Sequence, residues 1–502
     1  MTIRIFHASS PAATVLLAAA IDACCFTEPD RRILLLSRTG AAPEAGADVS
    51  ETIGFERLRA RFDEVLSWND AIFPFHPDGW LPRADDAPLW ERHFRRAWGL
   101  GDEPLELVVD SPHAGPARAL TQVFAGVPVD VYAEGPGGYG PTGEKLPPPA
   151  GTRVRRLLHP DLVPGVRPLL LGEYGVEPQI VPGGAITKVV GELADLDEEL
   201  SEAAGSALEL PDAGLPGVGV PGAGVPGAGV PDVEAPGAGL PDVEAPALLL
   251  GQDLAGAGLI TAAEEAGLRL EMVRGAAALG HTRLVFAPDP YAPWESPAAL
   301  LAEADRLGVG LTVLDTTRPV PADVLLHRLR PALVVGCTSA ALFGAARFHG
   351  LPVATVGTGL LLERLTPYEN AERIPATLAD AVLPALDDAK AVAAQKADGA
   401  AESDGSVRVN GEVKPDGADE VNGLLAAVGF AMRPKVRPDL RPDAERYLSA
   451  HLDGRTWRYF KRRRLASLAL PGVVPARLAF LRSNPALRRV ARRARALRRS
   501  GG

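Results

Sequence analysis

The chain has 502 residues, of which 46% are hydrophobic, so it is long enough for two or three folding units with substantial cores. Its three cysteines (Cys24, Cys25 and Cys337) exclude a disulfide-stapled secreted scaffold and favour a reducing, cytosolic setting. The net charge is −11, but the segment from Arg455 to Arg499 contains 15 of the 52 basic residues and no acidic residue, which leaves a strongly acidic body.

The first 185 residues alternate short apolar runs with helical patterns. The apolar runs predict strands at 3–8, 31–37, 105–111 and 127–134, and helical spacing indicates helices at 89–100 and 116–126. The apolar segment 11–25 follows the first strand and contains Asp22, so it is interpreted as a buried helix rather than a signal peptide. No stretch reaches the ~20 uncharged apolar residues that a membrane-spanning helix needs. Strand and helix alternation predicts a parallel sheet covered by helices, and we assign residues 1–203 to this domain.

The composition changes between residues 204 and 246. Valine, proline and glycine recur there with a period of five residues, as in "VPGAGVPGAGVP", and proline recurs too often for a helix or a central strand. We therefore predict a disordered linker.

A second α/β unit is predicted from 247 to 387. Its strands are expected within 247–255, 282–290, 308–315, 331–339 and 351–357, with helical stretches at 296–308 and 339–350. Residues 388–420 are polar and poor in large apolar side chains, which indicates a second disordered linker, and 421–502 is expected to be helical with a basic tail. Two doubly wound Rossmann-like domains of this kind place a ligand cleft between the carboxyl ends of their sheets.

Several segments resemble the bacterial alpha-2,8-polysialyltransferase-type family of GT-B glycosyltransferases. These are "VYAEGPGGYGPT", "LVFAPDPYAP", "ALVVGCTSAALFGAARFHGLPVATVG" and the "LLLGQ" that opens the second unit. The resemblance covers roughly 1–190 and 247–385. It implies transfer of sialic acid from the nucleotide donor CMP-sialic acid to a glycan acceptor, without a metal or another cofactor.

In that family an acidic pair before a glycine supplies the general base. Glu134 occupies one of the two positions and Ala133 the other, so the resemblance assigns the base to Glu134. A sugar hydroxyl is a weak nucleophile, and a carboxylate must take its proton as it attacks. The alternative is that Glu134 only caps a turn.

The family's donor-binding His-Pro pair corresponds to Asp289 and Pro290. An ionised aspartate would repel the donor phosphate by ~1–4 kcal/mol at effective dielectric constants of 80 to 20. Asp289 is therefore expected to be protonated or paired, to bind ribose hydroxyls, or to mark a different donor.

Thr338 and Ser339 follow a predicted strand and precede a predicted helix. Their hydroxyls and the free N–H groups at the start of the helix could bind the donor phosphate, as the family's serine motif does. Simple capping of the helix by Ser339 accounts for the same residues equally well.

Gly135, Gly137 and Gly140 fit the spacing of a G-x-G-x-x-G loop, but the prolines that follow cannot open the helix that a phosphate cradle needs. This stretch is instead expected to form a flexible lip of the cleft. His113 follows a strand and is interpreted as structural or exposed rather than catalytic. No pair of histidines has zinc-ligand spacing, so no metal site is expected.

The tail from Arg455 to Arg499 combines arginines with Trp457, Tyr459, Phe460 and spaced leucines. An amphipathic helix on an anionic membrane surface is the favoured interpretation, with nucleic-acid binding and a solvated tail as alternatives.

The sequence thus predicts a GT-B-like, cytoplasmic glycosyltransferase, and the basic tail favours a peripheral position at the inner face of the plasma membrane. Its expected partners are a nucleotide sugar, a glycan acceptor and an anionic membrane, and no nucleic acid. A GT-B transferase with another nucleotide sugar and an inactive sugar-binding or nucleotide-binding homologue are the alternatives.

Overall fold

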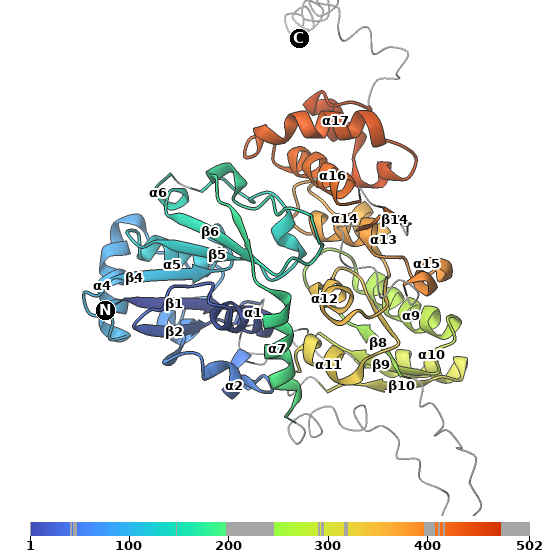
Figure 1. Ribbon diagram of the computed structural model, residues 1–502, viewed down its shortest axis with the longest axis horizontal. Helices are drawn as coiled ribbons and strands as arrows, with labels where there is room; N and C mark the ends of the chain where they lie inside the picture. Colours follow the sequence, from blue (N-terminus) through green and yellow to red (C-terminus); the bar gives the residue numbers. More distant parts are fainter. Residues whose placement is uncertain are drawn as a thin grey trace, which may run out of the picture.

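The computed structural model describes residues 2–40, 43, 48–146, 148–196, 245–289, 292, 296–315, 320–395, 407–409, 412–414 and 417–472. Residues 204–244 of the predicted linker 204–246 lie outside these ranges, and so does most of the predicted basic tail. Two α/β domains lie side by side, and helices α16 and α17 lie beyond them at one end (Figure 1).

The N-terminal domain is built on a parallel sheet of seven described strands in the order β3-β2-β1-β4-β5-β6-β7. The order reverses between β1 and β4, which are direct neighbours, and ligands of such sheets bind at this kind of switch point. The strands are β1 Ile3–Ala8, β2 Arg31–Leu36, β3 Glu64–Ser67, β4 Leu105–Val109, β5 Val129–Tyr132, β6 Val154–His159 and β7 Pro178–Ile180. The helices are α1 Pro11–Asp22, α2 Phe55–Arg59, α3 Trp68–Ile72, α4 Ala87–Ala97, α5 Ala117–Val123, α6 Pro148–Gly151 and α7 Gly183–Ala194.

Both faces of this sheet are covered. Along β1, Ile5 belongs to the hydrophobic cluster on one face, whereas Phe6 belongs to the cluster on the other face. Because successive side chains of a strand point to opposite faces, a strand buried on both sides is a continuous apolar run. This explains why β1, β2, β4 and β5 were predicted correctly from the sequence.

The C-terminal domain repeats the arrangement with five described parallel strands in the order β10-β9-β8-β11-β12. Here the order reverses between β8 and β11. The strands are β8 Ala247–Leu250, β9 Arg283–Ala287, β10 Gly310–Val313, β11 Leu333–Gly336 and β12 Val353–Thr355. The helices are α9 Ala262–Ala278, α10 Ala298–Leu307, α11 Ala322–Leu329, α12 Ala340–His349, α13 Thr358–Arg364, α14 Arg373–Val382 and α15 Ala389–Ala394.

Two helical elements join the domains. Helix α7, the last described element of the first domain, packs against both α1 and α11 (Figure 1). Helix α16 (Gly417–Met432) packs on α14, and its core cluster includes Tyr139 and Leu162 of the N-terminal domain. The two sheets are therefore held facing one another through continuous hydrophobic contact.

The described residues of the predicted linker 388–420 include regular elements. These are α15, the hairpin strands β13 Val407–Val409 and β14 Glu412–Lys414, and the first turn of α16. Gln395 follows α15 and bonds both ways to the backbone of Val353: its Nε2 donates to the carbonyl (2.8 Å), and its Oε1 accepts from the N–H (3.2 Å). A polar side chain thus completes the hydrogen bonds of edge strand β12.

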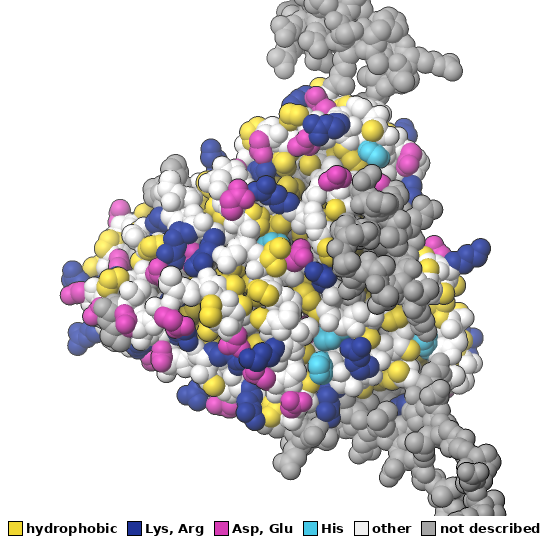
Figure 2. Space-filling view, in the orientation of Figure 1, with side chains coloured by type: hydrophobic (Ala, Val, Ile, Leu, Met, Phe, Trp, Pro, Cys, Tyr) yellow, Lys and Arg dark blue, Asp and Glu magenta, His cyan; other side chains and the backbone are white. Residues whose placement is uncertain are grey.

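The first part of the predicted basic tail is also folded. Helices α17 (Arg441–His451) and α18 (Arg462–Leu468) pack on α16. Tyr459, Phe460 and Leu465 are buried in this unit, and Arg464 donates to the backbone carbonyls of Ala431 and Met432. These aromatic residues are thus core residues and not a membrane-facing surface. On the face drawn in Figure 2, acidic and basic side chains are interspersed over the described surface.

Candidate active site

A cleft with a volume of about 520 Å³ lies between the two domains at the carboxyl ends of their sheets. Residues of both domains line it. The N-terminal domain contributes Ser10, which follows β1, and Glu134, which follows β5. The C-terminal domain contributes Gln252, Asp289 and Thr338, which follow β8, β9 and β11. A ligand in the cleft would contact both sheets.

Glu134 is half-buried in this cleft and held by one hydrogen bond. Ser10 Oγ donates to Glu134 Oε2 (2.7 Å), and the same Ser10 oxygen accepts from the backbone N–H of Ala13 (2.9 Å), which caps α1. Ser10, at the start of α1, thus holds the carboxyl group of Glu134 in place. The prediction placed Glu134 in the cleft, and it lies there.

The environment of Glu134 raises its pKa to about 7. Burial is the largest cause; the hydrogen bond from Ser10 opposes it, and the negative charges of Asp110 and Asp323 add to the rise. A general base works best when its pKa lies near the working pH. The carboxyl group therefore has the position and the pKa of a base that takes a proton from a ligand in the cleft.

His7 and Asp110 were not singled out from the sequence, although the charge of Asp110 acts on the pKa of Glu134. His7, buried in β1, has its Nε2 2.8 Å from Ser37 Oγ and its Nδ1 3.5 Å from Asp110 Oδ1. Burial alone would raise the pKa of Asp110, but its contacts with His7 and the N–H of Ser111 hold that pKa below its usual value. Asp110 is thus a fixed negative charge next to Glu134.

On the donor side, Thr338 is tied across the switch point of the second sheet. Its backbone N–H donates to Gln252 Oε1 (2.9 Å), and Gln252 Nε2 donates to Thr338 Oγ1 (3.3 Å). Ser339 Oγ accepts from the N–H of Ala341 (3.3 Å) and caps α12. Capping by Ser339 is therefore real, and both residues also line the cleft beside the start of the helix.

Asp289 lines the cleft directly after β9, whereas Pro290 lies outside the described residues. Two further carboxyl groups in the cleft were missed: Asp323 in the first turn of α11 and Glu372 at the start of α14. Burial raises the pKa of Asp323 to about 6 and also raises that of Glu372. Neither follows a strand, so no motif in the sequence marked them.

Ala133 does not line the cleft, although it occupies the position of the family's second acid. A Cβ placed on Gly138 would lie 2.6 Å from the Cβ of Ala133, so these two small residues pack against each other. The reason is the turn Pro136–Tyr139, which forms one 3-10 turn with Gly138 and Tyr139 buried. The expected flexible lip is thus a packed turn, and the next described helix is the single turn α6, which begins only at Pro148.

The remaining candidate residues lie outside the cleft. His113 is half-buried near Ser111, and burial lowers its pKa. Cys337 is buried, and burial raises its thiol pKa to about 12, which makes it unreactive. Within the described ranges, no three His, Cys, Asp or Glu side chains gather as a group able to hold a metal ion.

Two parallel α/β domains whose sheets direct their carboxyl ends at a common cleft have the GT-B architecture predicted from the sequence. Residues 239–358 match the model of the alpha-2,8-polysialyltransferase (POLYST) family. The match confirms the resemblance and identifies the chain as a glycosyltransferase. It includes Asp289, Thr338 and Ser339, whereas Glu134 lies outside it.

Solved structures that match most of the chain are distant in sequence. A UGT transferase from Siraitia grosvenorii in complex with UDP is 11% identical with a TM-score of 0.37, and the match covers 90% of this chain and 100% of that one. LpCGTa in complex with UDP is also 11% identical with a TM-score of 0.39, covering 89% and 99%. An O-GlcNAc transferase from Thermobaculum terrenum is 16% identical with a TM-score of 0.31, covering 93% and 69%. No curated protein matches the chain.

Within the described part of the chain, no helix is both long and apolar enough to cross a membrane.

Proposed function

We propose that the cleft transfers a sugar from a nucleotide-activated donor to a glycan acceptor, with sialic acid carried by CMP as the donor that the family favours. Glu134 acts as the general base for the acceptor hydroxyl. Asp289, Pro290, Thr338 and Ser339 form the donor side, and no metal takes part. One observation carries the proposal: a carboxyl group with a pKa of about 7 faces, across a two-domain cleft, the hydroxyl-bearing start of α12.

The roles follow from the positions of these groups. The acceptor hydroxyl loses its proton to Glu134 as its oxygen bonds to the anomeric carbon of the donor sugar. The hydroxyl of Thr338 and the first N–H groups of α12 can donate hydrogen bonds to the phosphate that departs. Gln252 holds Thr338 in place for this contact.

The first experiment is a thermal-shift comparison of CMP, UDP and GDP with the full chain. Stabilisation by CMP alone is the expected result, since a specific ligand stabilises the fold that binds it. Stabilisation by another nucleotide and not by CMP would instead favour the second candidate, a GT-B transferase with a different donor. Asp289 favours that candidate, because it stands where the family has a histidine and lines the cleft.

Transfer itself is tested with Glu134→Gln. The variant should lose donor hydrolysis and transfer while still binding the nucleotide. Equally weak activity of wild type and variant toward every sugar nucleotide tried would overturn the catalytic claim and leave a sugar-binding or nucleotide-binding protein.

The chain is also proposed to work at the cytoplasmic face of an anionic membrane, because the segment from 473 to 499 holds nine arginines and no acid.

A further inference from the structure

The cleft is unusually acidic for a site that binds an anion. Among the described residues that line it, four carry carboxyl groups and none is Lys, Arg or His; the four are Glu134, Asp289, Asp323 and Glu372. A phosphate beside one ionised carboxylate meets a repulsion of ~1–4 kcal/mol at effective dielectric constants of 80 to 20. A nucleotide that enters this cleft is therefore bound more tightly when one of the carboxyl groups becomes neutral.

Asp323 is the carboxyl group best placed for that change. It lies in the first turn of α11 on the donor domain, and its charge acts on Glu134 across the cleft. The one hydrogen bond found to favour its ionised form is with its own backbone N–H. A Cβ placed on Gly344 of α12 would lie only 3.0 Å from Asp323 Oδ1, so the glycine leaves room for the carboxyl group beside that helix.

We propose that Asp323 takes up a proton when the donor phosphate enters the cleft and then donates this proton to the phosphate oxygen that leaves the sugar. The proposal rests on the proposed function. It adds a general acid for the departing phosphate, a role that the proposed function leaves unassigned. It assigns the base to one domain and the acid to the other.

The step balances without a further reactant. The bond between the anomeric carbon and the phosphate oxygen breaks, and its electron pair leaves with the phosphate. The acceptor oxygen bonds to the anomeric carbon, and the acceptor proton passes to Glu134 while the proton of Asp323 passes to the phosphate. After the products leave, the proton on Glu134 returns through solvent to Asp323 when the next donor binds.

The surroundings of Asp323 agree with this role. Burial already raises its pKa to about 6, and a bound phosphate raises the pKa of a neighbouring carboxyl group further. Glu134, Asp289 and Glu372 line the same cleft, and none of these groups would compensate an added negative charge. The other charged or titratable groups on α11 and on the helices packed against it lie outside the described lining: His327 and Arg328 on α11, Lys188 and Glu192 on α7, and Arg347 and His349 on α12.

Calorimetric titration of the full chain with CMP and with UDP at pH 7, in buffers of different ionisation enthalpy, measures the proton uptake. Wild type should take up roughly 0.5 to 1 proton per bound nucleotide. Asp323→Asn should take up much less and bind as tightly as wild type or more tightly, since repulsion is removed. Glu372→Gln, which removes another carboxyl group from the cleft lining, is the matched control and should keep the uptake. Glu134 can contribute part of the uptake, so binding without uptake in wild type, or uptake in Asp323→Asn as large as in wild type, overturns the proposal.

Transfer kinetics test the second half of the step. An acid must be protonated, so the wild-type rate should fall as the pH rises through the pKa of Asp323 in the complex. This alkaline limb should vanish in Asp323→Asn, while the acid limb due to Glu134 remains; an alkaline limb that persists overturns the proposal. Gly344→Ala keeps the carboxyl group but displaces it and should lower kcat more than it changes nucleotide affinity; an unchanged kcat counts against the assigned position.

The proposed function and the role of Asp323 can be overturned independently. If neither nucleotide binds wild type, the proposed function falls and Asp323 falls with it. If a nucleotide binds and Glu134→Gln loses transfer, but no proton is taken up, only the role of Asp323 is overturned.

Discussion

The ionisation of Glu134 should be visible in the pH profile of the transfer rate. Its pKa of about 7 means that half of the carboxyl groups are protonated near neutral pH. Because a base must be ionised, the transfer rate should rise as the pH increases through about 7. Glu134→Gln should lower kcat by roughly 10²- to 10⁴-fold and remove this acid limb. Glu144→Gln changes an exposed carboxyl group outside the cleft and should leave the profile unchanged. A wild-type rate that does not change between pH 6 and 8 would contradict the assignment.

Ser10 provides a finer test at the same scale. Its hydroxyl donates to Glu134 and lowers the pKa of that carboxyl group by favouring the ionised form. Ser10→Ala removes the donor, so the pKa of Glu134 should rise and the acid limb should move upward by roughly half to one pH unit. The cap of α1 is lost as well, at a cost of about 1 kcal/mol in stability. Ser10→Thr retains a hydroxyl and should restore the position of the limb; a limb that does not move in Ser10→Ala would show that this hydrogen bond does not tune the base.

At the residue scale, the part of the site predicted from the sequence is the part that follows strands. Glu134, Asp289, Thr338 and Ser339 each come directly after an apolar run, and the carboxyl ends of parallel strands meet at one edge of a sheet. Asp323 and Glu372 start helices, so only the packing of α11 and α14 brings them into the cleft. His7 and Asp110 lie within or at the end of predicted strands, and only the side-by-side position of β1 and β4 pairs them.

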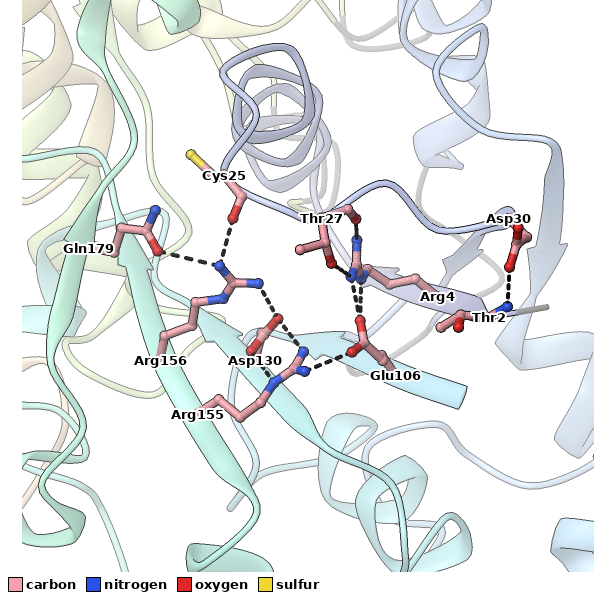
Figure 3. A network of polar contacts seen from close by, with 10 residues as sticks. All are labelled: Thr2, Arg4, Cys25, Thr27, Asp30, Glu106, Asp130, Arg155, Arg156 and Gln179. Carbon is pink, nitrogen blue, oxygen red and sulfur yellow. Dashed lines mark hydrogen bonds and ion pairs between the residues drawn. The ribbon is translucent and has the colours of Figure 1, made fainter. Parts of the chain in front are cut away.

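At the scale of elements, a charge network around the buried Asp130 ties four neighbouring strands of the first sheet together (Figure 3). Asp130 of β5 is fully buried and accepts hydrogen bonds from Arg155 (2.8 Å) and Arg156 (2.9 Å) of β6. Arg155 also donates to Glu106 of β4 (2.7 Å), which in turn pairs with Arg4 of β1. Burial raises the pKa of Glu106, but the hydrogen bonds from Arg155 and Arg4 outweigh it, and the net pKa is lowered.

Removal of one member of this network should destabilise the N-terminal domain. Asp130→Ala leaves the partly buried Arg156 guanidinium without its carboxylate, and we expect a loss of about 1 to 3 kcal/mol in the free energy of unfolding, because a partly buried charged donor loses its strongest acceptor. Arg155 keeps Glu106, which limits the loss. Urea unfolding followed by tryptophan fluorescence measures it, since Trp68, Trp80, Trp90 and Trp98 all belong to this domain. Glu56→Ala breaks an exposed pair with Arg59 and should cost less than about 1 kcal/mol. Equal losses in the two variants would refute the structural role of the network.

The same network explains why strand β6 was not predicted from the sequence. Strand β6 contains Arg155 and Arg156 in its first half, and these charges interrupt the apolar run by which buried strands are recognised. Only the pairing of β6 with β5 brings Asp130 opposite and makes the charges compatible with burial. The strands of the second sheet were predicted because most contain a short apolar run, such as Leu248–Leu250 in β8 and Leu333–Val335 in β11, although their ends were placed one to several residues too far.

At the scale of the whole molecule, contacts on either side of the cleft set the relation between the domains. Asn422 of α16 donates to the carbonyl of Gly165 (3.0 Å) and accepts from the N–H of Arg167 (2.9 Å). Arg347 of α12 donates to the backbone carbonyl of Asp161 (3.2 Å) and pairs with its carboxylate. Pro160 and Leu162, which flank Asp161, line the cleft. A change in the opening of the cleft therefore has to alter these interdomain contacts.

The basic segment 473–502 leads to a prediction about where the protein works. Residues up to 470 belong to the folded C-terminal unit, so a membrane-binding role falls to 473–502, where nine arginines occur without an acid. Each cation near an anionic surface contributes roughly 1 kcal/mol, which is enough for salt-sensitive binding. In liposome flotation, the full chain should bind vesicles that contain phosphatidylserine and release them at high salt, and a chain ending at 472 should not bind while it keeps its thermal stability and nucleotide binding. A truncation before 455 would remove Tyr459 and Leu465 from the core and would confuse unfolding with lost binding. Unchanged flotation of the chain ending at 472 would rule out the basic segment as the membrane contact.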